Sequence, residues 1–93
     1  MSHEDEYELV LTPPAGRALT GRLPEPVAAA VIDFLTTALV QQPQRVGKPL
    51  RGELAGIWAA RRGTYRVLYR VREQPREAIV VRIEHRRDAY RPY

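Results

Sequence analysis

The 93-residue sequence contains no cysteine, which excludes disulfide bonds, thiol catalysis and thiolate metal sites. It has only two histidines, His3 and His85, and their wide separation argues against a histidine metal cluster. There is no apolar run of about eighteen residues and the segment 1–6 is acidic, so neither a transmembrane helix nor a secretory signal is expected. These absences predict a cytosolic protein that uses no metal or other cofactor.

Lysine is almost absent as well, since Lys48 is the single lysine among the 15 basic side chains. High-GC codon usage can produce such a bias, so the placement of the charges carries more information. Residues 1–44 hold two basic and six acidic side chains, a balance of −4, whereas residues 45–93 hold thirteen and five, a balance of +8. This segregation predicts a basic working surface built by the C-terminal half.

The length suits one domain spanning 1–93 with a single modest core, and the 44% apolar content is that of a globular protein. Apolar periodicity, together with proline and glycine, divides the chain into elements. The elements expected are a strand over 7–11, helices over 12–21 and 23–43, an ordered loop over 44–56, and strands over 57–61, 64–72 and 78–85. The order β-α-α-β-β-β predicts an α+β fold, with a helical hairpin on one face of a small, mostly antiparallel sheet.

The helices have clear sequence signals. Thr12 precedes two prolines and is expected to cap the first helix, whose inward residues would be Ala15, Ala18 and Leu19. In the second helix apolar residues recur at spacings of three and four, which predicts one buried stripe. Its members are Val27, Val31, Phe34, Leu35, Ala38 and Leu39.

The most informative segment is the strand expected over 64–72. Tyr65, Val67, Tyr69 and Val71 alternate with a second set that contains Arg66, Leu68, Arg70 and Arg72. A strand face made of arginines carries like-charge repulsion that an anionic partner would relieve. Guanidinium groups bind phosphate oxygens in pairs and remain charged at any working pH, so a phosphate backbone is the expected partner.

Three strings resemble segments of the RelE/ParE superfamily, the toxins of type II toxin–antitoxin systems. They are Gly47–Arg51 with Leu54 and Gly56, Arg61–Tyr69, and His85–Arg91. The resemblance covers 7–91 and implies the fold expected above. Its RelE branch implies a ribosome-dependent endoribonuclease that cuts messenger RNA, and its ParE branch implies an inhibitor of DNA gyrase.

The RelE branch is favoured because Arg66, Arg86 and Tyr90 match an arginine, a basic residue and a tyrosine of its mRNA-cleaving members. The chain departs from that pattern in the strand over 57–61. Lysines are expected there, but only Arg61 supplies a charge. The general base is therefore left open. The resemblance also implies a small RelB-like antitoxin with an acidic helical segment, bound in a hetero-oligomer, with the ribosome and mRNA as further partners and no membrane.

RNA cleavage without a metal needs a base, an acid and cations for the charge that develops on the phosphate. Arg61 and Arg66, on neighbouring strands, are expected to hold that phosphate, although Arg66 can also be a solvated strand residue. Arg86 is a second phosphate contact, a surface charge or an antitoxin contact. Tyr90 is an acid, a base or a stacking group, or it packs over the edge of the sheet.

His85 is a candidate catalytic group because it titrates near neutral pH, but strand alternation places it with Ile79, Val81 and Ile83 and favours burial. Glu84 would then face the same side as Arg82 and pair with it. Trp58 is a core residue or a platform for an RNA base, and the core is favoured.

The remaining candidates are contacts to RNA or the ribosome, and they are Lys48, Arg51, Arg62, Arg70, Arg82 and Arg87. The alternative functions are a gyrase inhibitor and a basic nucleic-acid-binding module without activity.

Overall fold

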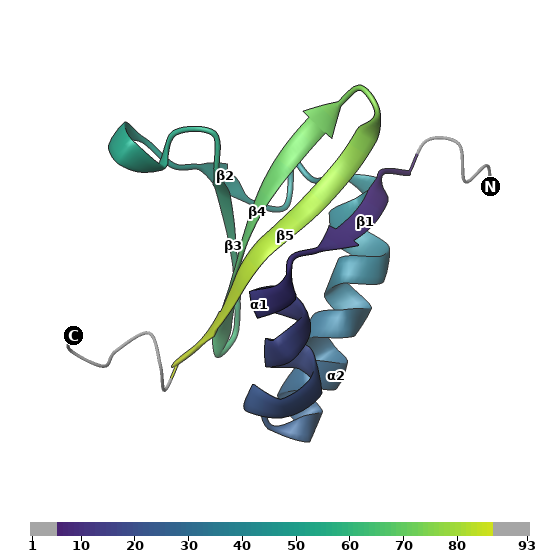
Figure 1. Ribbon diagram of the computed structural model, residues 1–93, viewed down its shortest axis with the longest axis vertical. Coiled ribbons are helices and arrows are strands. Elements are labelled where there is room, and N and C mark those ends of the chain that lie inside the picture. Colours follow the sequence, from purple (N-terminus) through teal and green to yellow (C-terminus); the bar gives the residue numbers. More distant parts are fainter. Residues whose placement is uncertain (1–5, 87–93) are drawn as a thin grey trace.

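The structure, a computed structural model in which residues 6–86 are described, has two helices packed against one face of a five-stranded sheet (Figure 1). The strands are β1 (Glu8–Leu11), β2 (Lys48–Pro49), β3 (Trp58–Arg62), β4 (Tyr65–Glu73) and β5 (Arg76–His85). Their order in the sheet is β1-β5-β4-β3-β2. β1 runs parallel to β5 and the other neighbours are antiparallel, so the predicted α+β fold with a mostly antiparallel sheet is confirmed.

One prediction about the elements is wrong. The segment 44–56 is not only a loop, because it contains β2 and a short 3-10 helix, η4 (Gly52–Leu54). β2 pairs with β3 over only two residues, a length too short to produce a strand pattern in the sequence. Figure 1 shows the segment 48–57, which we call the arm, projecting away from the body of the molecule.

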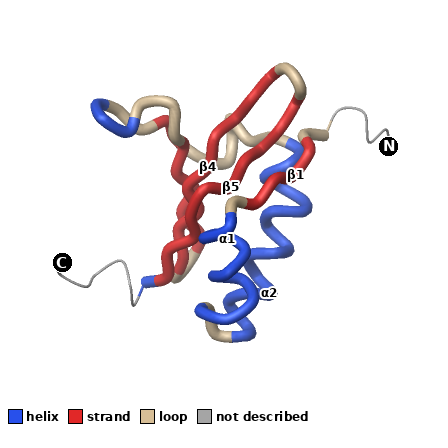
Figure 2. The backbone as a smooth tube through the Cα atoms, viewed as in Figure 1, coloured by secondary structure: helices blue, strands red, loops and turns tan. Residues whose placement is uncertain are grey.

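The helical hairpin begins where the sequence predicts. α1 (Pro13–Arg17) continues as the π-helical turn η2 (Ala18–Arg22), and α2 (Glu25–Phe34) continues as η3 (Leu35–Leu39), as Figure 2 shows. Thr12 caps α1, with its Oγ1 accepting a hydrogen bond from the backbone N–H of Ala15 at 3.4 Å. None of the helices in the described part of the chain is long and apolar enough to cross a membrane.

The core lies between the helical hairpin and the sheet. The alternation predicted for β4 is confirmed, because Tyr65, Val67 and Tyr69 are buried while Arg70 and Arg72 are exposed. The predicted helical stripe is confirmed too. Its most buried members are Val31, Phe34, Leu35 and Leu39. Burial of this apolar area is the main stabilising contribution to the fold.

Two core aromatics anchor β3 and the start of the arm. Trp58 stacks on Tyr69 with 6.4 Å between ring centroids, on the side of the sheet that faces the helices, which agrees with the core reading of Trp58. The Tyr69 hydroxyl donates a hydrogen bond of 2.6 Å to the carbonyl oxygen of Pro43. Gly47 passes so close that a Cβ there would lie 2.3 Å from this hydroxyl and 2.8 Å from the carbonyl oxygen of Ala59. The glycine is therefore needed for packing.

β5 contains a bulge that the sequence does not predict. Leu68 pairs with Arg82 and Tyr69 pairs with Val80, so Val81 is an extra residue in β5. The buried residues of the strand are consequently Ala78, Val80 and Ile83. The prediction that Ile79 and Val81 share a side with Ile83 and His85 is wrong, because the bulge reverses the alternation between Val80 and Ile83.

Thr12, which directly follows β1, holds the bulge from the edge of β5 that faces away from β4. Its backbone N–H donates to the carbonyl oxygen of Val80 at 3.0 Å, and its hydroxyl donates to that of Val81 at 2.9 Å. The residue that caps α1 thus also satisfies two carbonyl groups at the irregular point of β5.

Candidate phosphate-binding site

The face of the sheet opposite the helices carries most of the charged residues of β3, β4 and β5, and we call it the open face. In an antiparallel pair, residues directly opposite each other point to the same side. Arg66 in β4 is opposite Arg61 in β3 and opposite Glu84 in β5. The three side chains therefore form one row across three strands. This confirms the prediction that Arg61 and Arg66 lie on neighbouring strands.

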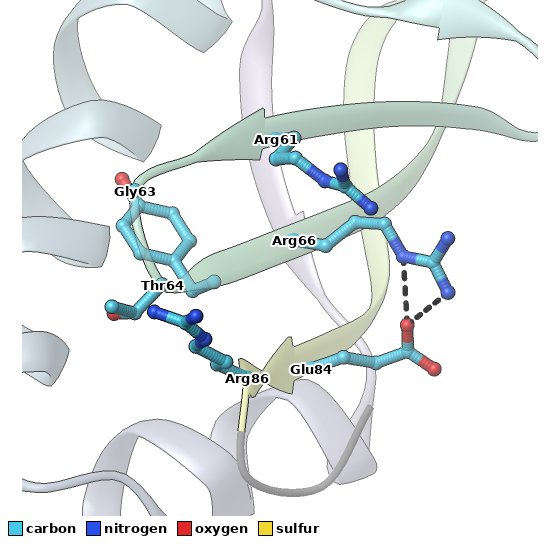
Figure 3. Close-up of a pocket in the computed structure, with 7 residues that line it drawn as sticks. Arg61, Gly63, Thr64, Arg66, Glu84 and Arg86 are labelled. Carbon is cyan, nitrogen blue, oxygen red and sulfur yellow. Dashed lines mark hydrogen bonds and ion pairs between the residues drawn. The ribbon is translucent and has the colours of Figure 1, made fainter. Parts of the chain in front are cut away.

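A hollow of about 350 Å³ opens beside this row, at the end of the sheet where β3 turns into β4 (Figure 3). We call it the arginine pocket, and it is lined by Arg61, Gly63, Thr64, Tyr65, Arg66, Glu84 and Arg86. Gly63 makes the tight turn possible, since its φ of 55° lies in the left-handed region. The backbone N–H of Arg86 donates to the carbonyl oxygen of Thr64 at 2.5 Å and so fixes Arg86 at the rim.

Glu84 is the centre of the charge network in the pocket. The Nε and Nη2 groups of Arg66 both donate to Oε1 of Glu84, the first at 2.8 Å (Figure 3). The other carboxylate oxygen, Oε2, lies 3.5 Å from Nε of Arg82. The predicted pairing of Glu84 with Arg82 is thus confirmed, and the pairing with Arg66 was not foreseen. Glu84 is 12% exposed and Arg66 is 40% exposed, so the carboxylate lies deeper than the guanidinium it holds.

The expectation of an unrelieved arginine face is wrong in one respect. Glu77, also from β5, lies opposite Arg72 and pairs with it at 3.6 Å, as Glu84 pairs with Arg66. The repulsion between the arginines of β4 is therefore partly relieved inside the protein. The pocket nevertheless has an excess of cations, because Arg61, Arg66 and Arg86 line it together with a single carboxylate.

The pocket has the chemistry of an anion site. Several guanidinium groups around one hollow can bind the oxygens of a phosphate and stabilise additional negative charge on it. Burial raises the pKa of the Tyr65 phenol, with Asp33 acting in the same direction and Arg62 in the opposite one. Tyr65 is therefore protonated at neutral pH and can donate a hydrogen bond. Within residues 6–86 there is no group of three or more His, Cys, Asp or Glu side chains able to hold a metal ion.

Several predicted site residues lie away from the pocket. The guanidinium of Arg62 is 4.8 Å from the centroid of the Phe34 ring, on the helix side of the sheet. His85 is opposite Tyr65 in the pairing, so it too points toward the helix side. Unlike Tyr65, it is not among the residues that line the pocket. Lys48 and Arg51 belong to the arm.

The remaining candidates extend the basic surface or fall outside the structure. Arg82 is next to Glu84 on the open face and is 56% exposed. Arg70 is exposed further along β4, and its Nη1 lies 3.8 Å from the position of a Cβ on Gly56, at the base of the arm. Arg87 and Tyr90 lie outside the described residues.

The role of Glu84 was missed because the contact depends on the bulge. From Glu73 opposite Arg76 to Tyr69 opposite Val80, β4 and β5 pair in one register, and this register would place Ile83 opposite Arg66. The extra residue Val81 shifts it by one and brings Glu84 there instead. The only signal in the sequence is the acidic residue itself, two positions after Arg82.

A second hollow of about 290 Å³ lies between β1 and the helices and is apolar. It is lined by Leu9, Leu11, Gly16, Leu19, Thr20, Ile32, Leu35 and Thr36. Leu11 and Ile32, which both line this hollow, are large aliphatic side chains that are 40% and 46% exposed.

Comparison with known proteins gives a consistent family. Residues 9–90 match the family model described as the ParE toxin of the type II toxin–antitoxin system parDE. The chain is 47% identical over 85 residues to toxin RelG of Mycobacterium tuberculosis, covering 91% of this chain and 97% of that one. It is 41% identical over 91 residues to toxin RelE of the same organism, covering 98% and 93%.

Solved structures agree. The toxin–antitoxin complex RelBE2 of M. tuberculosis contains a chain with a TM-score of 0.84 and 46% identity, and the match covers 87% of this chain and 99% of that one. The archaeal RelE–RelB complex of Pyrococcus horikoshii has a TM-score of 0.67 at 22% identity, with coverage of 87% and 96%, and shows the shared fold.

Proposed function

Since the chain belongs to the ParE toxin family within the RelE/ParE superfamily of type II toxin–antitoxin toxins, we propose that it is a ribosome-dependent endoribonuclease that cleaves messenger RNA and inhibits translation. The observation that carries the proposal is the arginine pocket, where three arginines from β3, β4 and the end of β5 line one open hollow. The two curated relatives, which bear RelE-type names, favour this branch over gyrase inhibition.

In the proposed reaction the 2′-hydroxyl of the RNA attacks the adjacent phosphorus, and the bond from phosphorus to the leaving 5′-oxygen breaks. Arg61 and Arg66 bind the non-bridging oxygens and stabilise the pentavalent state, and Arg86 makes a further contact from the rim. Because these arginines supply the positive charge, the reaction as proposed does not need a metal ion. We assign proton transfer or base stacking to Tyr90 on the strength of the family resemblance.

The wider basic surface would bind RNA and the ribosome. Lys48 and Arg51 on the arm, with Arg70 beneath it, suit contacts to the phosphate backbone of ribosomal RNA. Arg82 extends the pocket along β5, and Arg87 completes the proposed set. Arg62 is directed toward Phe34, and we assign it a packing role.

The proposed partner is a small RelB-like antitoxin that forms a hetero-oligomer with the toxin in the cytoplasm. The solved relatives in complex with RelB-type proteins support this proposal. An acidic helical segment would be attracted to the open face. An apolar side of the same partner could bury Leu11 and Ile32, which the hollow beside β1 leaves exposed.

Inhibition of DNA gyrase is the second candidate, because the matching family model is that of the ParE toxins. The deciding experiment is primer extension on a reporter mRNA in a purified translation system, with a gyrase supercoiling assay in parallel. Arg66→Ala is the test variant. Arg72→Ala is the matched control, since Arg72 lies on the same face of the same strand and is also paired with a glutamate of β5.

Discrete cuts on translating ribosomes, absent on naked RNA, are expected. Removing one preorganised donor to a developing oxyanion costs about 10²–10³-fold in rate, so Arg66→Ala should lose most of the cutting while Arg72→Ala keeps it. Intact mRNA together with inhibited supercoiling would refute the nuclease and establish the gyrase inhibitor.

A further inference from the structure

We propose that Glu84 is a positioning residue for Arg66: it holds one edge of the guanidinium and fixes the orientation of the group at the arginine pocket, which Arg66 lines. The inference that this matters for cleavage rests on the proposed function, whereas the pairing itself can be tested without it.

The geometry of the contact supports orientation as its role. Nε and Nη2 of Arg66 both donate to the same oxygen of Glu84, so the Nε edge of the guanidinium is occupied and Nη1 is left for a ligand. Figure 3 shows the guanidinium of Arg61 extending toward that of Arg66 from the neighbouring strand. Two cations placed in this way repel each other, and the carboxylate on the far side of Arg66 offsets the repulsion.

The fold keeps Glu84 in place better than it keeps Arg66. The Glu84 side chain is 12% exposed and is held by a second cation, because Oε2 lies 3.5 Å from Nε of Arg82. Arg66 is 40% exposed, and the Glu84 carboxylate is its hydrogen-bond acceptor among the described residues. Without that carboxylate, a long flexible side chain at this exposure would sample several rotamers instead of one.

The bulge in β5 serves the same contact. If Val81 paired regularly and formed no bulge, Ile83 would lie opposite Arg66, and the two hydrogen bonds from Thr12 to Val80 and Val81 hold the shifted register. Bulges frequently redirect a side chain near a functional site, and here the redirected side chain is Glu84.

The contact argues against Glu84 as the general base. Oε1 already accepts two hydrogen bonds from Arg66, so a proton from a 2′-hydroxyl could go only to Oε2, and its arrival would weaken the ion pair with Arg82. Glutamine can take over the role of a positioning glutamate but not that of a glutamate that acts as a general base. In Glu84→Gln the side-chain amide oxygen can still accept from Arg66, but it cannot accept the proton of the substrate.

The experiment compares Glu84→Ala and Glu84→Gln with wild type in single-turnover cleavage of reporter mRNA on ribosomes. Glu77→Gln, which alters the equivalent pair with Arg72, is the control. We expect Glu84→Ala to lower the cleavage rate by about 10–100-fold, the range that small misplacements of a catalytic group produce, and Glu84→Gln to recover most of it. The affinity for a non-cleavable 2′-O-methyl RNA should not fall in either variant, because a negative charge has been removed from the site.

The outcomes are distinct. Loss of rate with unchanged or tighter RNA binding, rescued by glutamine, supports positioning. Equal loss in the alanine and glutamine variants overturns it in favour of a general base. Faster cleavage in both variants overturns it in favour of a carboxylate that merely competes with the substrate phosphate.

A second measurement does not depend on nuclease activity. In ¹H–¹⁵N spectra of the free protein, the Nε–H of Arg66 should exchange slowly with solvent in wild type and in Glu84→Gln, and rapidly in Glu84→Ala. Rapid exchange in wild type would overturn the inference even if the protein cleaves mRNA. Slow exchange in a wild-type protein that does not cleave mRNA would refute the proposed function and still support the pairing. If Glu84→Ala does not fold, the glutamine variant and the wild-type spectrum decide the question.

Discussion

Gly47→Ala tests whether the glycine in the first of the three family strings serves packing. The new Cβ would lie 2.3 Å from the Tyr69 hydroxyl and 2.8 Å from the carbonyl oxygen of Ala59. The hydroxyl belongs to a fully buried ring and is bonded to the Pro43 carbonyl at 2.6 Å, so it cannot simply swing into solvent. Either the ring or the backbone of β3 must move.

The loss of folding stability expected for Gly47→Ala can be estimated from two contributions. Overpacking a tight site costs about 1–3 kcal/mol. Loss of the Tyr69–Pro43 hydrogen bond adds about 1 kcal/mol. A total near 3 kcal/mol corresponds to a fall in Tm of about 12–24 °C for a domain of this size.

Urea denaturation and thermal melts of the purified protein measure the effect. Gly16→Ala is the matched control, because no atom lies within 4 Å of its added Cβ, and it should leave stability unchanged or slightly raised. Tyr69→Phe combined with Gly47→Ala should be less destabilised than the sum of the single variants, since one of the two clashes is gone. A Gly47→Ala variant within about 0.5 kcal/mol of wild type would refute the reasoning, because surface substitutions without any clash already fall in that range.

Three further predictions concern titration, packing and binding. Burial raises the pKa of Tyr69 to about 12, so the fold favours the neutral phenol. The stability that the neutral Tyr69 phenol contributes is complete below the ordinary pKa of about 10 and is lost as the pH rises toward 12. Thermal melts between pH 9 and 12, together with the absorbance of the phenolate, measure this loss. A Tyr69 that titrates with an ordinary pKa would contradict the prediction. Arg62→Ala should cost about 0.5–1 kcal/mol through its lost contact with Phe34 and leave mRNA cleavage within about twofold, whereas a large loss of cleavage would return Arg62 to the site. RNA binding should weaken linearly in log–log plots against salt, and Arg70→Ala and Arg51→Ala should each lower the slope by about 0.7, while unchanged slopes would remove them from the interface.

Much of the fold follows from local patterns in the sequence. Strand alternation in β4, the apolar stripe of α2 and the Thr12 cap depend on neighbours a few residues away, and all three are confirmed. β2 was missed because two residues contain no period. The predicted orientation of Ile79 and Val81 was wrong because one extra residue in a strand moves every residue beyond it to the opposite face of the sheet.

The sequence by itself determined which cations are present and that Arg61 and Arg66 lie on neighbouring strands, because the hairpin between them is short. Only the tertiary structure decided what surrounds them. Glu84 meets Arg66 through a bulge pinned by Thr12, a residue 69 positions from Val81, and Arg62 is turned toward a helix. Alternation along a strand is a local property that the amino acids encode directly, whereas register between strands depends on contacts between residues that are distant in the sequence.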